Sequence, residues 1–250
     1  MSPSCVKSVL LPVLMENETL RPVEKGIGPD DGFTEFANAR GLLITRIGEY
    51  CSFCEMHCDH DLAVEHKLPK NYQHNKHLEL EWTNFLLACR NCNSTKGTKD
   101  IKLNELMWPD TNNTFYAFVY GPDAMIRVNP ALNDGQKLMA RSLLELVGVS
   151  RKLEMDSRLR VDPKLKDRRW MNREEAWRLA VDAYSDLQTS DTVSLRKYII
   201  RLAQAKGFWS VWMTVFASDK QMAAELIRGF PGTSTSCFDA DCRVLNSPER

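Results

Sequence analysis

The sequence has no excess charge of either sign and no long apolar run. Its 33 Lys and Arg residues balance 33 Asp and Glu residues. No overall field therefore draws the chain to nucleic acid, and any such binding must come from local patches. No stretch approaches the roughly 20 apolar residues of a membrane span. Internal repeats and low-complexity segments are also absent. These absences predict a globular protein with no membrane partner.

A targeting signal is missing as well. The apolar run from Val9 to Met15 is short, is broken by Pro12, and leads to Glu16 without a small-residue cleavage site. Eight cysteines in 250 residues do not suit a secreted disulfide scaffold, because the chain is long and four of them have metal-ligand spacing. We expect a cytoplasmic protein.

Two CxxC pairs form the strongest motif of the chain. Cys51 and Cys54 make the first pair, and Cys89 and Cys92 make the second. Each CxxC loop lets two thiolates converge on one ion, so the two loops together predict a tetrahedral zinc site. Because thiolates fill all four positions, water has no open place on this zinc. The predicted role of the zinc is structural.

Polar residues lie between the two pairs and directly after them. An apolar run at 62–64 ends at Glu65 and His66, Asn84 precedes the second pair, and Asn93 follows it. We expect a strand that ends at His66, a long loop at 71–81, and a second strand from Trp82 to Cys89. A helix would then start at Asn93.

This arrangement resembles the HNH (ββα-metal) endonucleases in their zinc-stapled form. The segments that carry the resemblance are YCSFCE, VEHKLPK, WTNFLLACRNCNSTKG and WPDTNNTF. Together they are similar to the HNH nucleases of bacterial Septu and retron-type anti-phage systems, which work with an ATPase partner. The resemblance implies an α+β fold, in which a zinc-stapled ββα-metal module precedes a mainly α-helical C-terminal region. It also implies hydrolysis of DNA phosphodiester bonds, with the C-terminal helices docking on the ATPase.

The resemblance further assigns roles within the motif. His66 would be the general base, and Asn84 would orient the site. Asn93 and Glu65 would hold a catalytic Mg²⁺ or Mn²⁺. Neutral imidazole suits the activation of water near pH 7, and oxygen ligands suit a hard cation. Many family members carry Asp where this chain has Glu65. The longer Glu65 side chain therefore either binds the metal directly or contacts a residue that binds it.

Two basic groups are candidate phosphate contacts. Lys96 lies one turn beyond Asn93. The segment 151–173 holds nine Lys or Arg and four acidic residues, a local net charge of 9 − 4 = +5, and it includes Arg168 and Arg169. Non-specific binding to duplex DNA is mostly charge neutralisation, which makes these residues candidates for DNA binding.

Four parts are expected along the chain. Residues 1–40 form an N-terminal arm and the first part of a lead-in helix, which is expected over 33–47 with an interruption near Gly41. Residues 41–133 form the HNH module and a following β-hairpin, in which Phe115, Ala117 and Val119 alternate onto one face. Residues 134–231 form a helical domain, with helices expected at 134–147, 164–188, 192–206 and 219–228 and a buried segment at 208–216. Asp134 and Asp219 are the expected helix caps, and Gly207 is the expected end of the third helix. Residues 232–250 are expected to be a frayed tail.

Two alternative functions use the same residues. One alternative is hydrolysis of RNA, for example transfer RNA, because the same site attacks either backbone. The other alternative is a non-catalytic zinc module that binds a partner or nucleic acid, with Glu65 and His66 in purely structural roles.

Overall fold

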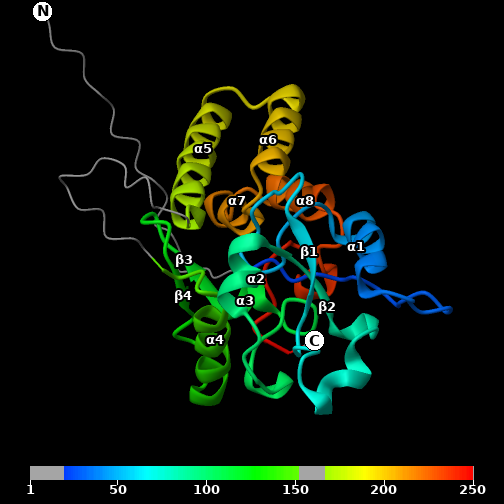
Figure 1. Cartoon of the computed structure of the whole chain (residues 1–250). Helices are drawn as coiled ribbons and strands as arrows, with labels where there is room; N and C mark the ends of the chain where they lie inside the picture. The colour runs from blue at the N-terminus through cyan, green and yellow to red at the C-terminus, as the bar shows by residue number, and fades with distance from the viewer. Residues whose placement is uncertain (1–19, 152–166, 250) are drawn as a thin grey trace, which may run out of the picture.

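The protein is a mixed α+β chain in which small sheets are surrounded by helices (Figure 1). The computed structural model describes residues 20–151 and 167–249. The strands are β1 (Leu62–His66), β2 (Phe85–Cys89), β3 (Phe118–Tyr120) and β4 (Ile126–Val128). The α-helices are α1 (Ala39–Ile47), α2 (Arg90–Lys96), α3 (Thr114–Ala117), α4 (Asp134–Val147), α5 (Arg169–Thr189), α6 (Val193–Lys206), α7 (Trp209–Val215) and α8 (Lys220–Gly229). Short 3₁₀ helices are η1 (Phe36–Asn38), η2 (Gln73–Leu78), η3 (Trp82–Asn84), η4 (Leu103–Glu105) and η5 (Thr235–Cys237).

Strands β1 and β2 form an antiparallel pair, and α2 follows β2 without a break. The register runs from Leu62 opposite Cys89 to His66 opposite Phe85. All five residues of β2 are buried, and α2 packs against both strands. The predicted order of strand, loop, strand and helix at 62–96 is confirmed.

Three boundaries in this region differ from the prediction. The segment 71–81 contains η2, and Trp82 lies in η3 instead of in the second strand. The backbone N–H groups of Asn84 and Phe85 donate to the carbonyl oxygens of Glu81 and Trp82, which closes a 3₁₀ turn before the strand begins. Helix α2 begins at Arg90, which places Asn93 in its middle and not at its start.

A second antiparallel pair, β3 with β4, is the predicted hairpin, but it is shorter than expected. Phe115 and Ala117 belong to α3 and not to a strand. The side chain of Asn113 caps this helix by accepting a hydrogen bond from Tyr116 N. That cap favours a helical turn over the extended conformation that the alternating pattern suggested.

The later helices follow the predicted caps closely. Helix α4 has the expected bounds, although Asn133 and Gln136 form its capping box, one residue before the predicted cap. Helix α8 is capped by Asp219, as expected. Helix α5 starts at Arg169, and Asp167 and Arg168 before it are not helical, whereas residues 164–166 of the predicted helix lie outside the described residues. Helix α1 continues through Gly41, where the sequence predicted an interruption.

The helices of the C-terminal half pack on one another and on the sheets. Helices α5 and α6 stand side by side at one end of the molecule, above α7 and α8 (Figure 1). Helix α7 is buried at every position, contacts β3, and joins the helical half to a common apolar core that includes β2. Among the described helices, none is both long enough and apolar enough to span a membrane.

The segment after α8 is not the frayed tail that the sequence suggested. Thr233, Ser234 and Cys237 are buried, and Thr233 pairs with Val23 in an antiparallel bridge. The side-chain amide of Asn113 donates to the carbonyl oxygens of Cys237 and Leu245. These backbone partners fix the segment on the body of the protein.

Candidate nuclease and metal site

The four predicted cysteines lie together in the structure. Cys51, Cys54, Cys89 and Cys92 are all buried, and their sulfur atoms lie within 4.8 Å of one another. Cys54 Sγ and Cys89 Sγ are 3.7 Å apart, far beyond the roughly 2.05 Å of a disulfide. Zinc–sulfur bonds of about 2.3 Å in a tetrahedron place two sulfurs about 3.8 Å apart. The cluster has the donor atoms and the spacing that zinc requires.

A guanidinium group lies directly against this cluster. Arg169 Nη1 donates to Cys92 Sγ at 3.1 Å and to the carbonyl oxygen of Val147 at 2.7 Å. Asp167 pairs with the same guanidinium. Only 1% of Arg169 is exposed, so it faces the cysteine cluster and not solvent, contrary to the position expected for a phosphate contact. Its neighbour Arg168 is exposed.

Most of the basic segment around these two residues falls outside the described part of the chain. Five of its Lys and Arg residues and three of its acidic residues lie between 152 and 166. At the end of the segment, Arg173 is fully buried and donates to the carbonyl oxygens of Ala124 and Val149. Arg168 is thus the exposed candidate from this segment among the residues at 167–173.

His66 occupies the last position of β1, where its ring is held on several sides. Phe36 and Phe85 meet the ring edge-on at centroid distances of 5.0 and 5.2 Å. His66 Nε2 lies 2.9 Å from the carbonyl oxygen of Glu79. A carbonyl oxygen only accepts, so Nε2 carries a hydrogen, and in the neutral ring Nδ1 then has the free lone pair. Burial lowers the pKa of His66 below its ordinary value, which favours the neutral ring near pH 7.

Asn84 fixes the loop that follows His66. Its Oδ1 accepts from Leu68 N at 2.8 Å, and its Nδ2 donates to the carbonyl oxygens of Leu68 and Leu78. Leu78 directly precedes Glu79, whose carbonyl oxygen bonds the His66 ring. The buried amide therefore holds two chain segments that both contact the histidine.

Glu65 points to the opposite side of β1 from His66, toward α2. Its Oε1 forms an ion pair of 2.7 Å with Lys96 Nζ. The side chain of Lys96 is 1% exposed. Lys96 therefore faces Glu65 inside the protein, whereas the sequence placed it where it would meet substrate phosphate. Burial raises the pKa of Glu65, and the charge of Lys96 opposes that shift.

Asn93 lines an open hollow on the outer side of β1 and α2. The hollow has a volume of about 550 Å³, and its other lining residues are His60, Asp61, Leu62, Ala63, Arg90 and Ser94. Among the described residues, none forms a hydrogen bond with the Asn93 side chain, which lines this hollow. The structure thus brings Glu65 together with Lys96 but does not pair Glu65 with Asn93.

Sequence reasoning missed a buried polar cluster formed by Lys25, Lys67 and Asp110. Lys67 was visible as the residue that follows His66, and Asp110 as part of WPDTNNTF. No pattern linked them, because their contact spans 43 residues of the chain. It also missed Glu55, a buried carboxylate in the first CxxC loop that accepts hydrogen bonds from Ser210 Oγ and N.

Comparison with known proteins gives a partial match. The chain is 39% identical over 70 residues to the Septu protein PtuB of Bacillus thuringiensis. The match covers 27% of this chain and 26% of that protein, so the compared segment spans about a quarter of the relative. No family model and no solved structure matches the chain.

Proposed function

We propose that this chain is a metal-dependent HNH-type endonuclease that hydrolyses DNA phosphodiester bonds. It would act as the nuclease effector of an anti-phage defence system, together with an ATPase partner. The observation that carries the proposal is the fixed ring of His66 at the end of β1. One ring nitrogen is committed to a backbone carbonyl, and the other is left to accept a proton.

Each residue then has a task in hydrolysis. His66 Nδ1 takes a proton from the attacking water, and the Glu79 carbonyl keeps the ring in the productive tautomer. Asn84 holds the loop and the Glu79 segment in place around the ring. Four thiolates would hold a structural zinc behind the strands.

A catalytic divalent cation would take oxygen donors from Asn93 and Glu65, which the structure does not pair with one another. Asn93 would supply its side-chain oxygen from the hollow on α2. Glu65 would contribute its carboxylate, which Lys96 orients through Oε1. When bound, Mg²⁺ or Mn²⁺ supplies charge neutralisation at the phosphate and the leaving oxygen.

The defence role rests on the partial likeness to a Septu protein. Nucleic-acid contact is assigned to the exposed Arg168. Lys96 and Arg169 would act indirectly, because Lys96 orients Glu65 and Arg169 supports the zinc cluster. The helical half is the proposed docking region for the ATPase.

The decisive experiment compares wild type with His66→Ala on supercoiled plasmid and on total RNA, in Mg²⁺ and in Mn²⁺. Losing a positioned general base costs about 10²- to 10⁴-fold in rate, so we expect plasmid cleavage by wild type only. Thermal unfolding and zinc content should remain unchanged in the variant. His77→Ala, which removes an exposed histidine, is the matched control.

Other outcomes separate the alternative functions. Degradation of RNA alone would identify a ribonuclease. Equal cleavage by wild type and His66→Ala would remove His66 from the mechanism. Absence of cleavage even with the co-purified ATPase and ATP would favour a non-catalytic zinc module.

A further inference from the structure

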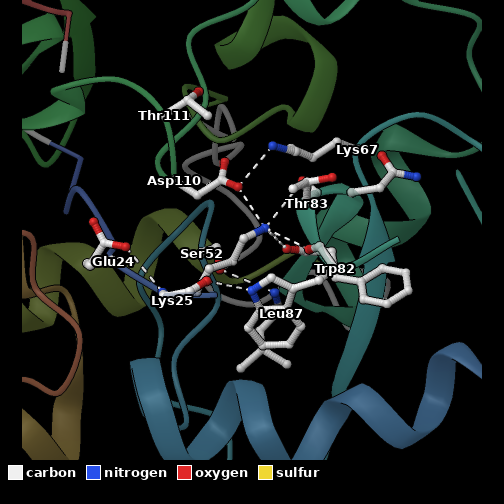
Figure 2. A network of polar contacts seen from close by, with 12 residues as sticks. Glu24, Lys25, Ser52, Lys67, Trp82, Thr83, Leu87, Asp110 and Thr111 are labelled. Carbon is white, nitrogen blue, oxygen red and sulfur yellow. Dashed lines mark hydrogen bonds and ion pairs between the residues drawn. The ribbon is translucent and has the colours of Figure 1, made fainter. Parts of the chain in front are cut away.

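A buried cluster of three charged side chains, Lys25, Lys67 and Asp110, lies next to the end of β1 (Figure 2). The Oδ2 atom of Asp110 is 2.8 Å from Lys25 Nζ and 2.9 Å from Lys67 Nζ. The exposed fractions of the three side chains are 3% for Asp110, 8% for Lys25 and 5% for Lys67. One carboxylate oxygen therefore links two segments of the chain that are 42 residues apart.

Lys25 connects this carboxylate to the segment that carries Asn84. Its Nζ donates to the carbonyl oxygens of Trp82 at 3.0 Å, Thr83 at 3.3 Å and Phe85 at 2.7 Å. In Figure 2 the ammonium lies between these carbonyls and Asp110. These three residues surround Asn84 in sequence, and the ring of Phe85 packs on His66.

Lys67 connects the same carboxylate to the catalytic strand. It directly follows His66, and its backbone N–H donates to the carbonyl oxygen of Asn84 at 2.8 Å. Within the described residues, Asp110 is the one hydrogen-bond acceptor for Lys67 Nζ. Asp110 thus sets the position of the Lys67 side chain. Because the backbone of Lys67 directly continues β1, this contact also holds the end of β1, where His66 lies.

We propose that Asp110 is a positioning residue for His66, acting through Lys67 and Lys25. Its shared oxygen holds the strand end that carries the base against the segment that carries Asn84. This inference rests on the proposed function, because it gives His66 the role of the base. It adds a residue from the WPDTNNTF segment and one from the N-terminal arm to the machinery.

The charge count predicts unequal effects within the cluster. Two ammonium groups share one carboxylate, so the buried cluster carries one net positive charge. Removing Lys67 leaves a neutral pair of Lys25 and Asp110, whereas removing the charge of Asp110 leaves two buried ammoniums without a counter-ion. Lys67→Met should therefore fold at least as well as Asp110→Asn, and it is the cleaner test.

The experiment measures the His66 ring and the kinetics separately in wild type, Lys67→Met, Lys67→Arg and Asp110→Asn. ¹⁵N NMR detects the His66 Nε2–H that donates to the Glu79 carbonyl oxygen, because a hydrogen-bonded ring N–H exchanges slowly with water. Lys220→Met is the matched control, since it breaks an exposed pair with Asp241 far from the site. Thermal unfolding and zinc content are recorded for every variant.

We expect Lys67→Met to retain its zinc and its melting temperature. Its ring N–H should exchange faster, and its kcat should fall about 10- to 100-fold, as for a displacement of about 1 Å. KM should stay the same, because neither Lys67 nor Asp110 touches substrate. Lys67→Arg should restore both signals, because a guanidinium keeps the pairing and also reaches Asp110 Oδ1, which has no partner among the described residues.

A wild-type ring N–H signal and wild-type kcat in Lys67→Met would overturn the proposal. A higher KM with an unchanged ring signal would also overturn it, because Lys67 would then contact substrate. If wild type cleaves no nucleic acid, the proposed function fails. The comparison of ring N–H exchange would still decide whether Asp110 positions His66.

Discussion

The proposed general base lies at the end of a buried strand and must satisfy two opposed requirements. Enough burial is needed to keep the imidazole neutral, and enough access is needed for water to reach its free nitrogen. His66 is 8% exposed, is packed between Phe36 and Phe85, and is tied through Nε2 to the Glu79 carbonyl. The aromatic contacts shield part of the ring from water, and the hydrogen bond selects the tautomer, so Nδ1 is the nitrogen that would accept a proton.

The lowered pKa of His66 predicts the pH dependence of cleavage. Burial disfavours the imidazolium form, so the ring stays neutral below the ordinary histidine pKa of about 6.5. At saturating Mn²⁺, kcat/KM should be flat near pH 7, and its acid midpoint should lie below about 6.5. Below the midpoint the rate should fall about tenfold per pH unit, because the charged ring accepts no proton. A midpoint above that value would contradict this environment for the base.

The grouping of the four cysteines was predictable from the sequence, but the ion pairs of the other motif residues were not. CxxC spacing specifies which sulfurs share an ion, since two residues between ligands make a loop of fixed reach. No sequence spacing indicates that Lys96 faces Glu65, because this contact exists only once α2 is packed beside β1. The position of Arg169 was not predicted either, because its contact with Cys92 also joins residues far apart in the sequence.

At the scale of elements, α5 does more than pack against its neighbours. Its first residue, Arg169, reaches both Cys92 Sγ and the carbonyl oxygens of Val147 and Gly148 at the end of α4. One side chain thus joins three elements around the cysteine cluster. A positive charge next to a site of four thiolates also offsets its negative charge.

Arg169→Met should loosen the zinc site and destabilise the fold. Two buried carbonyls and one sulfur lose a charged donor, which should cost about 2–4 kcal/mol of the free energy of unfolding. Zinc release to a chelator should be faster than in wild type. The exposed neighbour gives the control, because Arg168→Met should change neither quantity. Equal zinc release in the two variants would show that Arg169 does not support the cluster.

Helix and strand types followed from local signals where those signals were strong. Asp219 and Gly207 mark helix ends in the sequence, and α8 begins and α6 ends beside them. Weak signals failed at 105–120, where a short capped helix interrupts an alternating pattern. An Asn cap acts on three residues, whereas alternation needs a longer run to decide between strand and helix.

At the scale of the whole molecule, the segment after α8 is part of the body. Asn113 N donates to the Pro248 carbonyl, and the Asn113 amide donates to the carbonyls of Cys237 and Leu245. Asn113 is 1% exposed, so these bonds have little competition from water. Its buried position next to α3 therefore depends on chain from the far end of the sequence.

Deleting residues 235–250 should lower the melting temperature substantially. Each buried group of Asn113 that loses its partner costs about 1–3 kcal/mol, and the buried side chain of Cys237 is lost as well. Calorimetry of the shortened chain measures the loss, and a chain that ends at Glu249 is the control. An unchanged melting temperature would mean that the segment only covers the surface.

The hydrogen bonds between the N-terminal arm and the segment after α8 determine when, during synthesis, the arm can take its folded position. Arg21 donates to the Pro231 carbonyl, Glu24 N to the Gly232 carbonyl, and Ser234 N to the Pro22 carbonyl. The first of these contacts joins residues 210 positions apart. On the ribosome the arm emerges early, whereas Pro231 emerges 210 residues after Arg21. Lys25, which donates to the carbonyl oxygens on both sides of Asn84, belongs to that arm. The proposed cutting site would therefore be completed well after its motif is made, and a nascent chain near the messenger and the chromosome would carry the motif before it carries the activity.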